Sequence, residues 1–440
     1  MMVIALIIFA LTYVLMLALQ KYRPYIALTS AAIFVLLGCF GLWDYNPLDA
    51  LGAIDFNVLM MMAGTMGIVT LFIESRMPAR LSELMILKVP NVKWAVLLLS
   101  LFAGVISAFV DNVATVLMVA PVGLAISRKL KISPVPVIIA IAVSSNLQGA
   151  ATLVGDTTSI LLGGFADMNF FDFFWMNGRP GIFWGVELGA FVSLVVLLFL
   201  FRKDTQPIFA KVETVVDDYF PSWLMIGTVV LLILASFIPK PDGGFLLTLY
   251  SHRSGIICLL LCFIGIIREL VKHRSTEMLF KVVKDLDRDT LLLLIGLFIV
   301  IEGINRAGVI AAAAELFHNI AGDNPFILYT LLVFISVLLS AFIDNIPYVA
   351  TMLPVVQGIA ALMNGGAGVE PYVFYFGLLT GATLGGNLTP IGASANITAI
   401  GILRKNGENV TSRDFLRIGV PFTMAAVLTG YIFIWIFWKV

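Results

Sequence analysis

The sequence predicts an all-α polytopic membrane protein made of two inverted-topology repeats, each with about five transmembrane helices, one re-entrant hairpin and broken helices. Three observations predict it. The 440-residue chain is 60% hydrophobic and only 12% charged, with a mean hydropathy of +1.03, which is too apolar for a soluble protein of this length. A polar motif occurs twice inside apolar runs, and the apolar runs follow the same order in both halves.

The composition also excludes several functions. The 27 basic and 27 acidic residues cancel, so no basic surface indicates nucleic acid, and no soluble segment is long enough for a separate enzyme domain. The three cysteines lie in apolar runs and indicate neither a disulfide framework nor a metal site. Residues 1–20 are followed by Lys21, Tyr22 and Arg23 without a small-residue cleavage site, so we expect them to be a retained span.

The first repeat is predicted over 1–202. Apolar runs of spanning length lie near 2–20, 25–44, 57–75 and 182–202, with a short amphipathic piece at 80–89. The segment 91–127 contains two runs of about 15 residues joined at Asp111-Asn112, each short for a crossing, and is expected to be a re-entrant hairpin. The run 134–163 is expected to be a helix broken in its middle, which a membrane tolerates only where the freed backbone is buried or lines a cavity.

A polar segment, 203–221, is predicted to be a cytoplasmic linker, and 222–440 is predicted to be the second repeat. The same order recurs there: spans at 222–238, 254–271 and 289–306, a short piece at 311–320, a hairpin at 326–363, a broken helix at 371–403 and a closing span at 418–438.

Five crossings per half is an odd number, so the second half is expected to lie upside down relative to the first, as in secondary transporters. The charges agree. With both termini on the non-cytoplasmic side, the cytoplasmic connections hold 22 of the 27 Lys and Arg residues, and the other side holds Arg179, Lys240, Arg253, Arg306 and Lys439. This bias follows the positive-inside rule and predicts the orientation. We expect a multi-pass membrane protein, located in the plasma membrane if the source is prokaryotic.

The repeated motif is Asp111-Asn112 in the first half and Asp344-Asn345 in the second, each followed by a proline ten residues after the aspartate. An aspartate or asparagine at the start of a half-helix satisfies unpaired N–H groups and the helix dipole, and Pro347 suits a first turn. Serine or threonine would cap without bringing a charge into hydrocarbon. We therefore expect the pairs also to take part in ion or proton coupling.

The broken helices carry glycines, hydroxyls and amides that suit unusual backbone angles and ion ligation. Close packing of small residues is the alternative interpretation. The fixed distance to an Asp-Asn pair in both halves favours a substrate and ion site. The predicted site residues are Asp111, Asn112, Asn146, Thr152, Gly155, Asp156, Thr157, Asp344, Asn345, Asn387, Thr389, Gly392, Ser394 and Asn396.

The charge of the ligand stays open at this point. Half-helix N-termini that point inward favour an anion, whereas the carboxylates of Asp111, Asp156 and Asp344 favour a cation or a proton, and crowded carboxylates in low dielectric tend to hold protons. Glu74 and Glu302, near the ends of corresponding spans, are expected to pair with Arg76 and Arg306 or to face the interface.

The motifs Asp344-Asn345-Ile346-Pro347, Gly385-Gly386-Asn387 and Ile391-Gly392-Ala393-Ser394-Ala395-Asn396 resemble the ion transporter superfamily. That superfamily holds the arsenite permeases, the NhaD-type sodium/proton antiporters, the divalent anion/sodium symporters and the melanosomal P protein. The match is nearest to the arsenite permease and P protein branch. The resemblance implies a scaffold part, a mobile transport part that moves in an elevator-like way, and often a homodimer.

In the symporters of this superfamily a Ser-Asn-Thr triplet at each hairpin tip binds sodium and a substrate carboxylate. The corresponding triplets here are Asp111-Asn112-Val113 and Asp344-Asn345-Ile346, which lack the hydroxyls and add negative charge, so dicarboxylate substrates are not favoured. The resemblance implies sodium near Asn112, Gly155, Asn345 and Gly392. The first broken helix reads Gly155-Asp156-Thr157-Thr158-Ser159, where the P protein pattern is similar to Gly-Asp-Pro-Pro-Asn, and ligation there is expected to differ.

The leading interpretation is a secondary active transporter of a small anion or metalloid oxyanion, coupled to a proton or sodium gradient, and the alternative is a sodium/proton antiporter. A channel is not favoured, because it would need a continuous polar stripe and the polar residues here concentrate in the middle. An intramembrane enzyme is not favoured either, because it would need a catalytic pair on intact helices and only Asp111 with Asp344, on related hairpins, could serve. No cofactor is expected beyond the coupling ion, and the expected partners are a small inorganic or organic ion, the lipid bilayer and a second copy of the chain.

Overall fold

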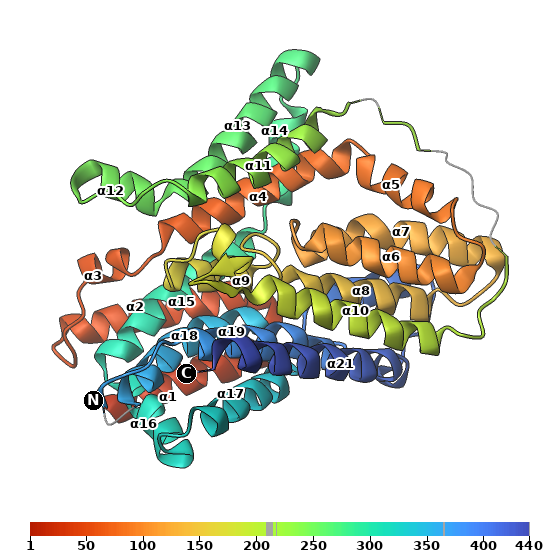
Figure 1. The fold of residues 1–440 in the computed structure, drawn as a ribbon. Helices are drawn as coiled ribbons and strands as arrows, with labels where there is room; N and C mark the ends of the chain where they lie inside the picture. Colours follow the sequence, from red (N-terminus) through yellow and green to blue (C-terminus); the bar gives the residue numbers. More distant parts are fainter. Residues whose placement is uncertain (208–213, 217, 364–365, 440) are drawn as a thin grey trace.

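The structure is a computed structural model that describes residues 1–207, 214–216, 218–363 and 366–439, and it confirms the predicted fold class. The described chain is nearly all helical, with one two-stranded β-ribbon (Figure 1). Within those residues seven helices are long and apolar enough to cross a membrane, or eight if the bent pair α15 and α16 counts as one span. The chain is an integral, multi-pass membrane protein.

The first half contains ten α-helices among its described residues. They are α1 (Met2–Ala18), α2 (Arg23–Cys39), α3 (Pro47–Gly52), α4 (Phe56–Glu74), α5 (Met77–Ile86), α6 (Val92–Ser107), α7 (Asn112–Leu130), α8 (Val135–Gly149), α9 (Thr157–Phe165) and α10 (Ile182–Leu200). Helices α6 and α7 form the first hairpin, and α8 and α9 are the two parts of the first broken helix.

The second half repeats this order with one additional short helix, α12, and with α14 at the place that α3 has in the first half. Its helices are α11 (Phe220–Ser236), α12 (Gly244–Ser251), α13 (Arg253–His273), α14 (Glu277–Asp285), α15 (Arg288–Arg306), α16 (Val309–Ala321), α17 (Pro325–Ser340), α18 (Asn345–Leu362), α19 (Tyr372–Leu379), α20 (Ser394–Lys405) and α21 (Ser412–Trp438). Residues 208–213 and 217 of the expected linker lie outside the described residues, and the limits of the two repeats stay predictions.

All four hairpin arms begin at an aspartate or asparagine that accepts hydrogen bonds from the first helical turn. Asn91 accepts from the Trp94 amide, and Asn324 accepts from the Phe326 and Ile327 amides. At the two tips Asp111 and Asp344 do the same for α7 and α18. These caps satisfy donors that hydrocarbon would leave unpaired, and they explain why both arms of each hairpin start where they do.

The two halves pack reciprocally, as a two-fold relation between them requires. In the two repeats α4 corresponds to α15, and α2 corresponds to α13. Helix α4 packs along α13, and in the same way α15 packs along α2. Helix α7 contacts α20, and its counterpart α18 contacts α9, the counterpart of α20. Helices α10 and α21, which correspond to each other, lie side by side (Figure 1). This cross-packing is what two inverted repeats produce when they share one pseudo-axis.

The helices form two groups. The paired-helix group consists of two sets, α4 with α11 and α13 and α15 with α1 and α2, which meet where α4 contacts α15; the hairpin group consists of α6 to α10 and α17 to α21. In Figure 1 α4, α11 and α13 lie at the top, well away from α17 and α21 at the bottom. The groups meet where α4 contacts α9 and where α15 contacts α18.

Both predicted broken helices are interrupted, but in different ways. Helix α8 stays α-helical to Gly149, and α9 starts at Thr157. In the second half α19 ends at Leu379, and a π-turn (Thr380–Leu384) and a 3₁₀ turn (Gly386–Leu388) precede α20. π-turns inside helices are frequent at functional sites, and this one lies at the centre of the hairpin group.

Some elements differ from the expectation. Helices α7 and α18 have 19 and 18 residues, longer than the arms of about 15 expected in the first hairpin, and they satisfy the length and composition test for a membrane span. Their partners α6 and α17 are shorter. The strands β1 (Trp175–Met176) and β2 (Arg179–Pro180) were not predicted; Asn177 and Gly178 both have positive φ and turn the chain between them.

Candidate functional site

Each hairpin tip is fastened to the break in the helix beside it by the same hydrogen bond. The Thr152 hydroxyl donates to the carbonyl of Ala108 in the first half, and the Thr389 hydroxyl donates to the carbonyl of Ala341 in the second. Both carbonyls belong to the turn between two hairpin arms, so each threonine supplies the partner of a backbone group that the turn leaves free.

A glycine in each break lets the backbones of tip and break approach closely. A Cβ on Gly155 would lie 2.7 Å from the carbonyl oxygens of both Ala108 and Ser107, and a Cβ on Gly392 would lie 2.8 Å from that of Ser340. Both distances are shorter than real Cβ atoms show. Gly155 and Gly392 are therefore required by space at two equivalent positions.

Asparagine side chains connect the two halves across the pseudo-axis. The amide of Asn112 donates to Asn146 Oδ1 at 3.0 Å, and the amide of Asn146 donates to the carbonyl of Thr383 at 2.9 Å. From the second half Asn387 donates to the carbonyl of Val143 at 2.8 Å. These side chains are buried, and each bond between halves joins one broken helix to the other.

Asp156 lies at the junction of the two halves. It caps α9 through the Thr157 amide at 2.8 Å, accepts the Thr158 hydroxyl at 2.8 Å, and accepts the Asn345 amide at a long 3.4 Å. The Thr158 hydroxyl is also 2.9 Å from that of Thr383. Asp156 lines the same small cavity as Asp111, and its partner Asn345 follows Asp344 directly in the chain, so three acidic groups share this region.

Asp111 faces the paired-helix group. Its carboxylate accepts the Val113 and Ala114 amides at 3.0 and 3.1 Å. With Gly155, Asp156 and Thr157 it lines a small cavity of about 20 Å³ against α4. Within the described residues no basic side chain forms an ion pair with Asp111.

Asp344 has a basic partner that sequence reasoning missed. The Arg23 guanidinium, at the start of α2, donates to Asp344 Oδ2 at 2.9 Å. Beside this ion pair the Tyr13 hydroxyl donates to the Pro347 carbonyl at 2.6 Å and lies 2.5 Å from the Thr351 hydroxyl. Nothing in the sequence relates positions 13 and 23 to 344. The only feature of the sequence that could have drawn attention to Arg23 is its charge at the start of an apolar span, and Tyr13 has no such feature.

The second half also contains oxygen atoms that suit a hard cation. Asn396 donates through its amide nitrogen to the carbonyls of Gly386 and Thr389 at 3.1 and 3.2 Å. Its Oδ1, like that of Asn387, is buried and has no hydrogen-bond partner in the described part of the chain. Buried amide oxygens beside backbone carbonyls are ligands that sodium accepts, and such orphaned groups are costly unless something binds them. Ser394, half-buried, begins α20 next to them.

The structure thus brings the predicted residues together at the two tips and the two breaks. Those at the first tip and break are Asp111, Asn112, Thr152, Gly155, Asp156 and Thr157; those at the second are Asp344, Asn345, Thr389, Gly392, Ser394 and Asn396; Asn146 and Asn387 connect the halves. Sequence reasoning missed Thr383, which does not stand out in a run of small residues, and it quoted Thr158 in the first broken helix without including it among the predicted site residues.

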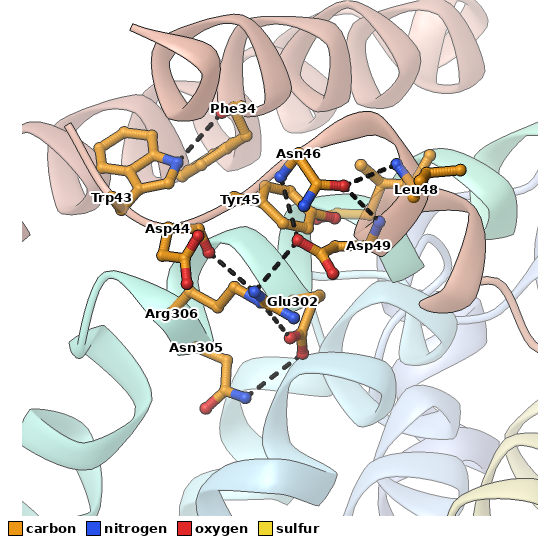
Figure 2. Close-up of polar contacts among 11 residues, drawn as sticks. Phe34, Trp43, Asp44, Tyr45, Asn46, Leu48, Asp49, Glu302, Asn305 and Arg306 are labelled. Carbon is orange, nitrogen blue, oxygen red and sulfur yellow. Dashed lines mark hydrogen bonds and ion pairs between the residues drawn. The ribbon is translucent and has the colours of Figure 1, made fainter. Parts of the chain in front are cut away.

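A larger cavity of about 620 Å³ separates the two groups of helices. Its walls come from α9, α15, α16 and α18 and from the connection before α4, with Asp55, Glu302 and Gln357 among its polar residues and Ala350 nearest to the second tip along α18. At its rim Arg306 pairs with Glu302 at 2.7 Å and with Asp49 at 3.2 Å (Figure 2). The predicted pairing of Glu302 with Arg306 is confirmed, whereas Glu74 pairs with Lys281 at 2.6 Å rather than with Arg76, because α14 brings Lys281 to the end of α4.

Comparison with known proteins gives one consistent picture. A family model described as citrate transporter (CitMHS) matches residues 4–378. The uncharacterized transporter Rv2685 of Mycobacterium tuberculosis is 30% identical over 99% of both chains. The human P protein is 25% identical over 86% of this chain and 53% of its own length. The solved YdaH transporter of Alcanivorax borkumensis has a TM-score of 0.60 at 15% identity, with 96% of this chain and 98% of that chain covered, which is a likeness of fold.

Proposed function

This chain belongs to the citrate transporter family of secondary transporters, and from that premise we propose that it moves a small anion or metalloid oxyanion, coupled to a proton or sodium gradient. Alternating access would carry the substrate between the two sides, with the hairpin group moving in an elevator-like way against the paired-helix group.

The observation that carries the proposal is the equivalence of the two tip-and-break units. Thr152 with Gly155, and Thr389 with Gly392, make the same contacts to their own hairpin tips. A repeat that preserves such detail in both halves supports one shared site that can be opened by either half. Four helices, α7, α9, α18 and α20, begin at this site, and their positive ends favour an anionic substrate.

A coupling cation is supported by the carboxylates and the free amide oxygens. Asp111 and Asp156 lie together without a basic partner in the described residues. In the second half Asn387 Oδ1 and Asn396 Oδ1 would hold sodium. A cation bound at these oxygens would offset negative charge and so favour the entry of an anion.

A sodium/proton antiporter is the second candidate. The surplus of carboxylates at the tips favours it, since three aspartates and, among the described residues, one paired arginine lie there. In that case the same oxygens would exchange sodium for protons, and no anion would be carried.

The orientation proposed for the chain places both termini on the non-cytoplasmic side, because most Lys and Arg residues then face the cytoplasm. The cavity beside Glu302 and Asp55 would then open away from the cytoplasm. A homodimer is proposed by analogy with the superfamily that the sequence resembles, with the paired-helix group as the part that would hold two copies together.

The test is transport by the purified protein in proteoliposomes. Arsenite, sulfate, citrate and sodium are offered in turn, each against an imposed proton gradient and an imposed sodium gradient. We expect one anion to accumulate above equilibrium with one of the gradients, and Asp344→Asn to abolish the coupling while the protein still inserts. Equilibration without accumulation would indicate a channel and contradict the proposal, and sodium movement driven by protons alone would select the second candidate.

A further inference from the structure

We propose that Arg23 is an internal counter-ion that competes with the coupling cation for Asp344 and displaces it when the second hairpin tip lies opposite α2. The inference rests on the proposed cation-coupled transport and adds to it the group that releases the cation. It also assigns a function in coupling to a residue outside the hairpins.

The ion pair is well formed and largely shielded. The Arg23 side chain is 16% exposed and that of Asp344 is 10% exposed, and their contact is 2.9 Å. Arg23 Nε also donates to the Met16 carbonyl at 3.2 Å, which fixes the guanidinium against α1. Asp344 Oδ1 accepts the Ile346 amide at 3.1 Å, so Oδ1 caps α18 while Oδ2 is left for a cation.

The equivalent tip in the first half has no such partner in the part of the chain that the structure describes. Asp111 uses its carboxylate to cap α7, and it lies beside a second carboxylate, Asp156. The position in the second break that corresponds to Asp156 is Ala393, which gives α20 no side-chain cap. The two tips therefore differ in charge: the first has two carboxylates and no ion pair among the described residues, and the second has one carboxylate paired with a guanidinium.

The two members of the ion pair belong to different groups of helices. Arg23 starts α2, which packs along α15 in the paired-helix group, whereas Asp344 belongs to the second hairpin. Tyr13 of α1 bridges the same two groups through Pro347 and Thr351. A movement of the hairpin group along the paired-helix group that exceeds the reach of the arginine side chain would separate Arg23 from Asp344.

A separated Asp344 would be a buried carboxylate without a counter-charge, which is strongly unfavourable. A sodium ion or a proton would therefore take the place of the guanidinium, and the return of Arg23 would release that cation again. The charge at the tip stays balanced in both positions, because one cation replaces another.

Other ionisable groups near Asp344 do not supply the missing charge. Tyr13 from α1 and Tyr348 from α18 are neutral phenols, and Asp156 and Asp111 from the first half are acidic. Arg23 is thus the cation whose presence or absence decides what Asp344 binds.

The experiment measures cation binding to the purified protein in detergent through its thermal unfolding midpoint. Sodium chloride is titrated at alkaline pH, and in a second arm the pH is varied in choline chloride without sodium. We expect Arg23→Gln to lower the sodium concentration that gives half of the maximal shift in the unfolding midpoint. The expected decrease is about tenfold, because sodium then no longer competes with a guanidinium for Asp344. If the response appears only as a new pH dependence in choline chloride, the cation is a proton, which also supports the proposal.

Three further variants make the result specific. Arg23→Lys keeps the charge and should keep the wild-type sodium concentration. Tyr13→Phe removes a neighbouring contact between the same helices without a charge change, so it should lower the midpoint but leave the sodium concentration unchanged. In Arg23→Gln combined with Asp344→Asn the gain in affinity should disappear.

The outcomes separate this inference from the proposed function. A wild-type protein that responds to sodium or to pH, together with an Arg23→Gln variant that responds identically, would overturn the counter-ion function alone. A wild-type protein without any response to either cation would overturn the coupled transport on which the inference rests.

Discussion

The aspartates at the two hairpin tips are the residues whose placement in this molecule is energetically most unfavourable. Asp111 and Asp344 bring charge into apolar surroundings, and each is used first as a helix cap. Thr152 and Thr389 satisfy the tip carbonyls, and the breaks beside them contain a glycine. Because the same solution appears twice, each residue can be tested against its counterpart or against a similar residue elsewhere.

The glycine in the first break is predicted to be irreplaceable. Gly155→Ala would place a methyl group against two hairpin carbonyls and the carbonyl of Gly149, so we expect transport to be lost and stability to fall by about 1–3 kcal/mol. Gly227→Ala in α11, where nothing lies within 4 Å, should keep transport and gain roughly 0.5–1 kcal/mol. Equal transport by the two variants would contradict the close approach.

The threonine in the same break is predicted to stabilise the tip. Thr152→Val removes the partner of the Ala108 carbonyl, and an unsatisfied buried acceptor costs about 1–3 kcal/mol. Thr423→Val is the matched control, since that hydroxyl is buried and has no hydrogen-bond partner among the described residues. Thermal unfolding in detergent should show a clear loss for the first variant and little for the second; similar losses would mean that the bond contributes nothing particular.

The positions of the candidate site residues could be predicted from the sequence where the repeat marked them, and their function in transport stays a prediction. Asp344, Asn345 and Gly392 recur at fixed offsets from Asp111, Asn112 and Gly155, and a duplicated polar residue in an apolar run indicates function. Arg23 could not be predicted, because its contact with Asp344 joins positions 321 residues apart and depends on how the groups pack.

At the scale of elements, the two hairpins and the two broken helices form one unit per half. The apolar runs and their polar interruptions predicted all four, with ends within a few residues of those observed. The π-turn at Thr380–Leu384 and the short helices α12 and α14 were not predicted, since each is shorter than the patterns that the sequence shows.

Asp218 is predicted to make stability depend on pH in acid. Burial would raise its pKa, but hydrogen bonds from Arg268, Lys272 and the Phe220 amide outweigh burial and hold the pKa below its usual 3.8. A carboxylate with a lowered folded-state pKa stabilises the protein above the unfolded value, and that contribution is lost as the pH falls below about 4. We expect the thermal midpoint of the wild type to fall more steeply there than that of Asp218→Asn. Parallel curves for the two proteins would contradict it.

At the scale of the whole molecule, the reciprocal packing of α4 on α13 and of α15 on α2 places the two hairpins on either side of one axis. The odd number of crossings per half predicted the inversion, but it did not predict which helices would pair across the halves. The central claim is that both tips reach one interior site that opens to each side in turn.

The most direct test measures from which side of the membrane the two tips can be reached. Val113 and Ile346 are half-buried and occupy equivalent positions at the two tips. Each is replaced by cysteine in a protein whose exposed Cys39 has been changed to serine. A membrane-impermeant thiol reagent is added to one side or the other of oriented proteoliposomes, with the sodium gradient imposed in either direction. The account predicts that both cysteines react from the same side in a given condition, and that this side changes when the gradient is reversed. Reaction of Val113→Cys from one face only and of Ile346→Cys from the opposite face only, under every gradient, would contradict it.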